Sequence, residues 1–397
     1  MNVLVLNCGS SSLKFQLINM DNEEVLTIGI CDRIGIEGSQ IAYKPAGRDK
    51  IKRDIDMPDH TAAVKIVLDS LTNEVDGVIK SMDEIAAVGH RVVHGGEAFS
   101  ESVVINKLVK AAIEGVSDLA PLHNPANLVG ISACEKLMPN TPQVAVFDTA
   151  FHQTMEDKAY LYAVPYKYYK KHKLRRYGFH GTSHKYVAYR TAEFLGRNVE
   201  DMKIVVCHLG NGASVCAVNG GKSVDSSMGL TPLEGLVMGT RSGDLDPAIV
   251  QFIAQKENLT LDEVITVLNK ESGIKGVSEL SSDFRDIEDA YNAGDERAIR
   301  AMGVFHLRVA KYIGAYAAAM NGIDAVVFTA GLGENNKDVR REICEYLEFL
   351  GVKVDDELNN VRSKERDFSA EGATVRSLVI PTNEELAIAR ETKELLK

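Results

Sequence analysis

The chain opens with a short apolar strand that runs directly into a turn of small polar residues, and the same device returns near its middle. Val3–Leu6 is apolar, the turn after it reads NCGSSS, and Leu13–Ile18 alternates apolar and polar residues as a strand does. Ile204–Val218 repeats this order around the Gly-rich letters HLGNGAS. Two strand–turn–strand units in one chain favour two copies of one domain plan.

Amphipathic helices are predicted between and after these strands. Ala62–Leu71 places its apolar residues on one face, and a second helical stretch runs from Gly333 to about Leu350. Val375–Ile380 reads as a late strand, and Thr382 with Glu385 fits a capping box that opens a last helix. Strands that alternate with helices predict an α/β fold with mixed or largely parallel sheets.

Length and charge limit the classes of protein that fit. The 397 residues suggest two to three domains at about 150 residues each. A first boundary is expected near residues 148–155, after the predicted strand Gln143–Phe147. The net charge of −11 has the wrong sign for nonspecific binding to nucleic acid or to an anionic membrane. We therefore expect neither as a partner.

Two further features indicate a cytoplasmic protein. No apolar run reaches the ~18 residues that cross a bilayer, and the first residues lack the basic region of a secretory signal. The 6 cysteines include no CxxC pair, and several lie in apolar runs. We expect them to be buried free thiols in a reducing compartment.

Three Gly-rich loops follow predicted strands, at Asn7–Ser12, Gly210–Ser214 and Gly331–Asn335. Glycine lets backbone N–H groups approach a phosphate closely. One such loop is usually a hairpin turn, but three in an α/β chain favour nucleotide binding. The Walker pattern fails because Cys216 stands where its first Gly is required, and the Rossmann pattern fails because Asn336 stands where its last Gly is required.

Arginine and histidine residues gather beside Gly and Pro, where an Arg can hold a phosphate or carboxylate through two parallel hydrogen bonds. The segments are Gly89–Gly96, Pro121–Pro125, Gly178–His184 and Met238–Asp244. Each alone is more often a structural ion pair, but together in an acidic chain they favour an anion site. His180 and His184 lack the glutamate of an HExxH zinc site, so zinc is not expected.

Two acidic residues stand where α/β proteins place functional groups. Asp148 follows a predicted strand, at the end where such sheets hold catalytic residues. An aspartate at this position could equally be a helix N-cap or a loop residue without a catalytic role. Glu384 stands near the start of the last helix. Its negative charge there either interacts favourably with the helix dipole or holds an Mg²⁺ ion through water.

These segments together resemble the acetate kinase family, nearly end to end. The resemblance runs from Asn7–Lys14 to Pro381–Glu385, with Phe147–His152, Gly229–Pro247 and Phe328–Asn335 between them. Departures are small and remove no charged group: Leu332 stands where Ile is common, and Ser226 where Thr is common.

The resemblance implies a fold of two similar actin-like, ribonuclease H-like domains with mixed sheets flanked by helices and the nucleotide in the cleft between them. The N-terminal domain would comprise residues 1–150, completed by a C-terminal helix at 385–397, and the domain at 151–384 would carry the adenosine site. The family also implies a homodimer.

The implied reaction is reversible phosphoryl transfer from ATP to acetate, with Mg²⁺, for which Mn²⁺ could substitute. Arg91 and Arg241 would hold the acetate carboxylate and the moving phosphoryl group, and His180 would stabilise charge on it. The catalytic residues implied are Asn7, Arg91, His123, Asp148, His180 and Arg241, with Asn7 and Glu384 at the metal. The acetate would lie against Arg91, Val93, Leu122, Phe179 and Pro232. The ATP site would comprise Ser12, Lys14, His208, Gly210, Asn211, Gly212, Asp283, Phe284, Arg285, Gly331, Gly333 and Asn335.

Three alternatives stay open at this point. A propionate kinase of the same family differs by one methylene, which is worth only about 1–3 kcal/mol in an apolar pocket. Val93 narrows the predicted pocket and favours acetate. A non-acyl ATPase on the same fold would not need both arginines and an acyl pocket, and a sugar kinase would need a general base, for which Asp148 is available.

Overall fold

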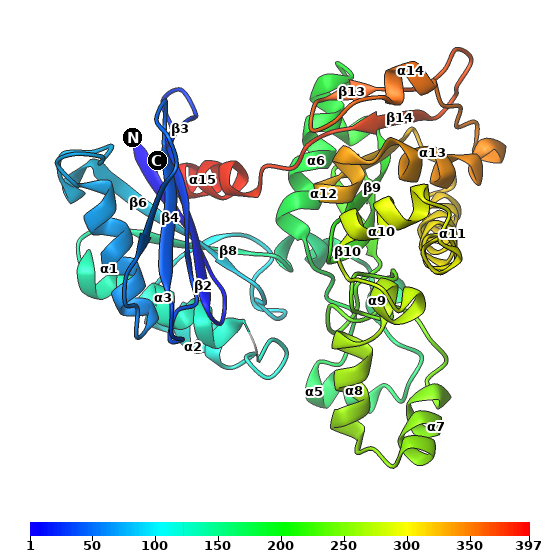
Figure 1. Cartoon of the computed structure of the whole chain (residues 1–397), viewed down its shortest axis with the longest axis horizontal. Coiled ribbons are helices and arrows are strands. Elements are labelled where there is room, and N and C mark those ends of the chain that lie inside the picture. The colour runs from blue at the N-terminus through cyan, green and yellow to red at the C-terminus, as the bar shows by residue number, and fades with distance from the viewer. Residues whose placement is uncertain (122) are drawn as a thin grey trace. The chain divides into compact units, whose positions relative to one another are not determined.

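The computed structural model describes residues 1–121 and 123–397, so the predicted pocket residue Leu122 lies outside the described residues. The chain divides into two compact units, which are described separately (Figure 1). Unit 1 comprises Met1–Gln153 and Asn383–Lys397, and unit 2 comprises Thr154–Thr382. The domain limits given above stay a prediction.

Unit 1 is built on an 8-stranded mixed sheet in the order β5-β4-β3-β2-β1-β6-β8-β7. Its strands are β1 (Asn2–Cys8), β2 (Ser12–Asn19), β3 (Glu24–Asp32), β4 (Gln40–Pro45), β5 (Ile51–Asp54), β6 (Ile85–Val92), β7 (Val103–Val104) and β8 (Gln143–Phe147). Its helices are α1 (His60–Leu71), α2 (Lys107–Glu114), α3 (Asn124–Leu137) and α15 (Glu384–Leu395). β1 pairs with β2 antiparallel and with β6 parallel, and β6 pairs with β8 parallel.

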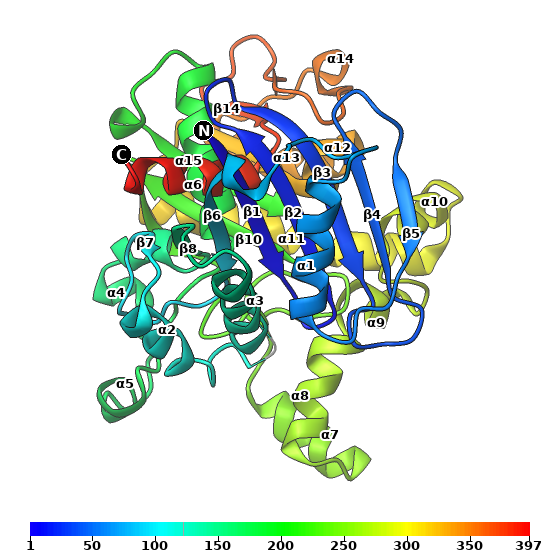
Figure 2. The same cartoon turned by 90° about the vertical axis from the view of Figure 1, so that its left-hand side faces the viewer.

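The two faces of this sheet are covered by different helices, as Figures 1 and 2 show. Along β1 the side chains alternate. Leu4 and Leu6 belong to the core that includes α1 and α3, whereas Val3 and Val5 belong to the core that includes Ile388 of α15. The last helix of the chain therefore completes the core of the unit that the first strand begins.

Unit 2 repeats the same central order on a 6-stranded sheet, β11-β10-β9-β12-β14-β13. Its strands are β9 (Lys203–Leu209), β10 (Ala213–Asn219), β11 (Lys222–Ser226), β12 (Ala325–Thr329), β13 (Arg366–Asp367) and β14 (Arg376–Val379). β9 pairs with β10 antiparallel and with β12 parallel, as β1 does with β2 and β6. The predicted repeat of one strand–turn–strand plan is confirmed.

The helices of unit 2 flank this sheet, with α6 and α11 on opposite faces (Figure 1). They are α4 (Asp157–Tyr160), α5 (Lys167–His172), α6 (Gly181–Phe194), α7 (Ala248–Glu257), α8 (Leu261–Lys270), α9 (Gly273–Ser278), α10 (Phe284–Asn292), α11 (Glu296–Ala319), α12 (Ala330–Asn335), α13 (Lys337–Glu345) and α14 (Asp356–Asn359). Both sheets are mixed and flanked by helices, as the α/β prediction requires.

Two local predictions are wrong. The helix predicted from Gly333 to Leu350 is broken at Asn336, whose side chain accepts hydrogen bonds from the first turn of α13. The capping box at the last helix does not form, because Asn383 is the N-cap and accepts from the Leu386 N–H. In both places a nearby asparagine caps the helix, which its short side chain does well.

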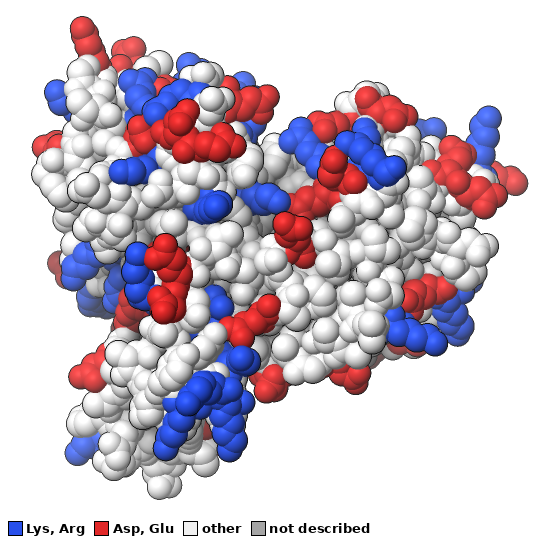
Figure 3. Space-filling view, turned by 180° about the vertical axis from the view of Figure 1, so that it is seen from behind, with Lys and Arg blue, Asp and Glu red and all other residues white. Residues whose placement is uncertain are grey.

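All 6 cysteines are buried and none forms a disulfide in the described chain, as predicted. Among the residues that the model describes, none of the helices has the length and apolar character needed to span a membrane. On the face drawn in Figure 3, Lys and Arg side chains and Asp and Glu side chains lie in small groups scattered among uncharged residues.

Candidate active site

The loop after β1 in unit 1 is fixed by hydrogen bonds from two helices, α1 and α3. The Gly9 N–H donates to the Ser12 carbonyl at 2.8 Å, and the Gly9 carbonyl lies 2.7 Å from His60 Nε2 of α1. Asn127 of α3 donates to the Cys8 carbonyl at 2.8 Å. The loop backbone is thereby fixed, and Asn7 projects from its start toward Arg91, with 3.5 Å between Asn7 Oδ1 and Arg91 Nη1.

Arg91 and Asp148 form a two-point ion pair at the ends of neighbouring parallel strands. Arg91 Nε donates to Asp148 Oδ1 at 3.0 Å and Nη2 to Oδ2 at 2.5 Å. Asp148 is 1% exposed, whereas the Arg91 side chain keeps 23% exposure. The buried carboxylate orients the guanidinium and leaves one edge of it accessible, which suits a group that binds an anion.

Glu384 reaches the same pair from the start of α15. Its Oε2 lies 4.0 Å from Arg91 Nε. The pKa of Glu384 is raised to about 7, chiefly by burial and also by the carboxylates of Asp148 and Glu385. Arg91 and Lys14 act in the opposite direction and limit the rise. A carboxylate among other carboxylates is a place where a divalent cation would relieve repulsion.

The donor set of unit 1 fits Mg²⁺ as an ion that keeps much of its water. The amide oxygen of Asn7 and the carboxylates of Asp148 and Glu384 surround Arg91, and oxygen ligands are what Mg²⁺ prefers. No group of three or more His, Cys, Asp or Glu side chains suited to a metal is found in residues 1–121 and 123–397.

Removing the carboxylate of Glu384 should change how stability depends on pH. The pKa of Glu384 is raised in the folded state, so its proton stabilises the fold at low pH, and this contribution is lost as pH rises from 4.5 to about 7. In Mg²⁺-free protein, Glu384→Gln should be more stable than the unaltered chain at pH 8, by about 1–2 kcal/mol for a side chain that keeps some contact with solvent. The difference should shrink at pH 5.

Urea unfolding at the two pH values measures this difference. The control is Glu394→Gln, farther along the same helix, whose partner is the exposed Lys397. An equal difference between Glu384→Gln and the unaltered chain at pH 5 and pH 8 would contradict the raised pKa.

The remaining predicted residues of unit 1 lie near this group or at its margin. Ser12 and Lys14 begin β2 beside the first loop, and Lys14 lines a hollow of about 490 Å³ on the sheet face together with Glu385. Val93 is 6% exposed, and its N–H donates to Asn127 Oδ1 at 3.1 Å. His123 lies exposed at the N-cap position of α3.

In unit 2, the predicted adenosine residues surround a single hollow of about 500 Å³. It lies over the end of β9 and the starts of α10 and α12. Its walls are Gly210, Asn211, Asp283, Phe284, Arg285, Glu288, Gly331, Leu332, Asn335, Asn336 and Arg362. This volume falls within the range of small-molecule pockets. Gly333 is not among these walls, and its carbonyl accepts a hydrogen bond from the buried Arg340 at 2.9 Å.

Arg241 lies beside the second Gly-rich loop and differs from Arg91 in its partners. A Cβ placed on Gly212 would lie 3.5 Å from Arg241 Nη1 and 3.7 Å from His180 Nε2. Arg241 Nη1 donates to the Pro232 carbonyl at 3.3 Å, and no carboxylate pairs with it anywhere in the described chain. Burial lowers the pKa of Arg241. A partly buried cation with only neutral acceptors is suited to an anionic ligand.

Three histidines pack against each other behind this arginine. The rings of His180 and His208 are stacked with centroids 4.2 Å apart, and His184 lies one turn beyond His180 on α6. Ser183 Oγ lies 2.8 Å from His208 Nδ1. His180 itself has a φ of 57°, in the left-handed region, where a non-glycine residue is uncommon. Phe179, the preceding residue, is 2% exposed.

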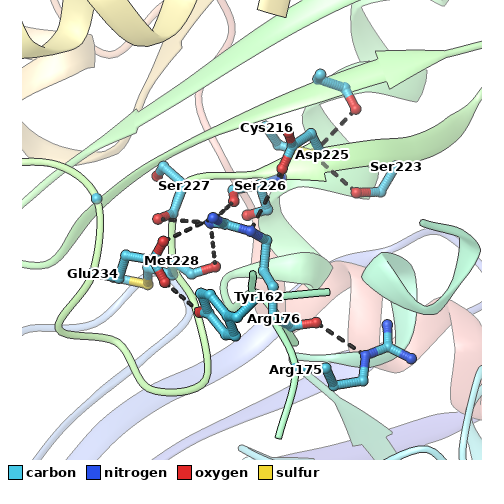
Figure 4. Close-up of polar contacts among 12 residues, drawn as sticks. Tyr162, Arg175, Arg176, Cys216, Ser223, Asp225, Ser226, Ser227, Met228 and Glu234 are labelled. Atoms are coloured by element: carbon cyan, nitrogen blue, oxygen red, sulfur yellow. Dashed lines mark hydrogen bonds and ion pairs between the residues drawn. The ribbon is translucent and has the colours of Figure 1, made fainter. Parts of the chain in front are cut away.

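The loop that carries Pro232 and Arg241 is clamped by Arg176, which Figure 4 shows in close-up. Arg176 Nη1 donates to the Ser226 carbonyl at 2.6 Å, and Nη2 donates to Glu234 at 2.7 Å. Tyr162 also donates to Glu234 and accepts the Leu230 N–H at 2.9 Å. This network ties the start of the loop to Tyr162 and Arg176, two residues outside the predicted site.

The structure thus gathers the predicted residues into one set in each unit. Asn7, Arg91, Asp148 and Glu384 form the set in unit 1, and His180, His208, Gly212 and Arg241 form the set in unit 2. The sequence prediction missed Glu288 and Arg362 in the hollow, since neither stands in a Gly-rich loop. It also missed the Arg176 clamp, which lies in a stretch that reads as a solvated basic segment.

Comparison with known proteins gives one consistent family. Residues 2–390 match the model of the acetokinase family. The acetate kinases of Alkaliphilus metalliredigens and Agathobacter rectalis are each 62% identical to this chain, with all of both chains covered.

Solved structures agree with this result. The crystal structure of Porphyromonas gingivalis acetate kinase is 49% identical with a TM-score of 0.97, over 100% of both chains. That of a Francisella tularensis propionate kinase is 42% identical with a TM-score of 0.93, over 99% of both chains. Because the family model matches residues 2–390 and relatives of 62% identity cover the whole chain, the chain belongs to the acetokinase family.

Proposed function

We propose that the protein is a kinase that transfers the γ-phosphoryl group of ATP reversibly to acetate, giving acetyl phosphate and ADP, with Mg²⁺. Membership of the acetokinase family and full-length relatives named acetate kinase support the proposal. The observation that carries it is Arg241, a cation without a carboxylate partner in the described chain, beside His180 and the loop at Gly212. That arrangement suits a transferring phosphoryl group.

The chemistry needs alignment and positive charge more than it needs a base. Acetate is already ionised at pH 7, so the attacking oxygen has no proton to lose. The barrier comes from bringing an anion to a polyanion, and catalysis must align the two and neutralise charge. Arg91 would hold the acetate carboxylate, Arg241 the phosphoryl oxygens, and His180 would donate a hydrogen bond to the same group.

Asp148 supports this reading and disfavours a sugar kinase. Both of its carboxylate oxygens accept hydrogen bonds from Arg91. A carboxylate held in this way orients a guanidinium and is a poor proton acceptor for a substrate hydroxyl. Asn7, Asp148 and Glu384 would hold Mg²⁺, which when bound neutralises charge on the phosphate oxygens.

The adenosine part of ATP would lie in the 500 Å³ hollow of unit 2. Phe284 offers an apolar wall, 8% exposed, and Asn335 and Asp283 offer polar groups beside it. Gly210 and Asn211 lead from this hollow into the loop that holds Gly212. Base, sugar and phosphates would thus follow one path toward Arg241.

The test is a trap for the acyl phosphate. Purified protein is incubated with Mg-ATP and hydroxylamine, and acetate, propionate or butyrate is added in parallel. Hydroxamate that forms fastest from acetate would support the proposed reaction. Hydroxamate from none of the three acids, with the fold intact, would contradict it, and ATP turnover without any carboxylate would then favour an ATPase.

Propionate kinase is the second candidate, since one of the similar solved structures bears that name. If Val93 lines the acyl pocket, Val93→Ala should raise kcat/KM for propionate relative to acetate by about 5–50-fold, the worth of roughly one methylene. Parallel hydroxamate assays measure this ratio. The control is Val92→Ala, one residue earlier, which belongs to the core that contains Ile113 and Ile131.

An unchanged ratio in Val93→Ala would remove Val93 from the pocket. A preference for propionate in the unaltered protein would keep the chemistry and overturn the choice of acetate.

Assembly and location complete the proposal. The family resemblance supports a homodimer, and light scattering should then give twice the chain mass of 43.4 kDa. A mass equal to one chain would contradict it. The buried free thiols support a cytoplasmic location, because such cysteines persist in a reducing compartment.

A further inference from the structure

One buried hydroxyl group bridges two of the three histidines that pack together in unit 2. Ser214 Oγ, on β10, lies 2.8 Å from His180 Nδ1 and 2.7 Å from His184 Nε2. Ser214 and His184 are both 0% exposed. In the sequence, Ser214 is recognisable only as the last residue of a Gly-rich turn.

The other nitrogen of His180 points toward the proposed phosphoryl site. A Cβ placed on Gly212 would contact His180 Nε2 at 3.7 Å and Arg241 Nη1 at 3.5 Å. His180 therefore has Nδ1 on Ser214 and Nε2 on the side of the loop and the arginine. In a neutral histidine only one ring nitrogen is protonated. The hydrogen bond at Nδ1 therefore determines whether Nε2 acts as a donor or as an acceptor toward a ligand.

Counting protons leaves two arrangements when both rings are neutral. The hydroxyl of Ser214 has one proton and can donate it to only one ring, so the other ring donates to Ser214. If His180 Nδ1 were the donor, its Nε2 would present a lone pair to an anionic phosphoryl oxygen, which is repulsive. If Ser214 donates to His180 Nδ1, then His180 Nε2 carries a proton toward that oxygen.

We propose that Ser214 is a positioning residue that holds His180 in the tautomer protonated at Nε2, with His184 Nε2–H donating in turn to the Ser214 oxygen. The inference rests on the proposed function for the role of His180. His184 donates to Ser214, Ser214 donates to His180, and His180 donates to the phosphoryl oxygen, which only accepts. No proton needs to move along this chain during the reaction.

The tautomer is measured directly by NMR of protein labelled with ¹⁵N at its 10 histidines. Protonated and bare ring nitrogens have well-separated ¹⁵N shifts, and the His180 signals are assigned by their loss in His180→Asn. In the unaltered protein, His180 should be protonated at Nε2 and bare at Nδ1. In Ser214→Ala, the two nitrogens should move toward a tautomer average.

Kinetics give the second readout. Ser214→Ala should lower kcat about 10-fold, the worth of one oriented hydrogen bond, with KM for acetate and for ATP changed less than about 3-fold. Ser214→Thr keeps a hydroxyl and should retain both the tautomer and most of the turnover. The matched control is Ser226→Ala, on the adjacent strand, whose Oγ is buried and has no hydrogen-bond partner within the described residues.

The outcomes separate this inference from the proposed function. A proton on Nδ1 of His180 in the unaltered protein, or an unchanged tautomer in Ser214→Ala, would overturn the role of Ser214 even if the protein is an active kinase. An unaltered protein that forms no acyl phosphate would overturn the proposed function. The NMR result would still decide the role of Ser214 in setting the tautomer.

Discussion

Replacing Arg241 with alanine is expected to lower turnover by at least about 100-fold and to leave the fold as stable as before. The loss follows from the role proposed for Arg241, whose charge is balanced by no carboxylate of the described chain and would be met by the phosphoryl group. An arginine at a phosphoryl transition state is worth roughly 10³–10⁵ in rate.

The stability part of this prediction follows from the same geometry. Arg241 is partly buried, and burial lowers the pKa of its guanidinium, so holding the charge there costs free energy. Within residues 1–121 and 123–397, its hydrogen-bond acceptors are the neutral Pro232 carbonyl and Met238 Sδ. Removing the side chain should therefore change the free energy of unfolding by less than about 1 kcal/mol.

Hydroxamate assays and urea unfolding of Arg241→Ala and Arg241→Lys measure both effects. The lysine variant keeps the charge but not the planar fork, so its turnover should lie between those of the alanine variant and the unaltered protein. Near-normal turnover in Arg241→Ala would remove this residue from the mechanism.

Replacing Arg91 with alanine is expected to lower turnover as strongly, by at least about 100-fold, and also to destabilise unit 1 by about 3 kcal/mol. The difference lies in Asp148. Its carboxylate is 1% exposed and accepts two hydrogen bonds from Arg91, so the alanine variant leaves a buried charge without its partner. Glu384, a second carboxylate nearby, worsens the repulsion.

A double variant tests this account of stability. Arg91→Ala combined with Asp148→Asn removes both charges of the pair and should recover most of the lost free energy of unfolding, while turnover stays low. Urea unfolding of the single and double variants gives the coupling between the two residues. A double variant as unstable as Arg91→Ala would show that the uncompensated charge is not the cause.

Much of the candidate site follows from local patterns in the sequence. Asp148 directly follows an apolar strand, and Arg91 lies near the end of another, so both belong to one edge of a sheet once β6 and β8 pair in parallel. The Gly-rich loops likewise mark strand ends, and two of them border the same hollow. These features depend on residues close in sequence, where strand and turn preferences are strong.

The rest depends on contacts between distant segments, which no local pattern specifies. The sequence shows two arginines in similar Gly-rich settings, but only the fold shows that Arg91 has a buried acid and Arg241 does not. The capping box failed for the same reason: Thr382 Oγ1 lies 2.8 Å from Ser183 Oγ of a distant helix, and Asn383 caps α15 instead. Ser214 gains its two histidines only through the packing of α6 against the sheet.

The discontinuity of unit 1 has a consequence for the order in which the protein is made. A ribosome synthesises β1 first, but the helix that covers Val3 and Val5 of that strand, α15, begins only at Glu384. While unit 2 is being translated, the apolar face formed by those valines with Ala87, Val144 and Val146 has no helix of its own chain to cover it. The N-terminal sheet must wait for the last residues to leave the ribosome, so the window in which a chaperone could bind that face lasts from the completion of β8 until α15 is made.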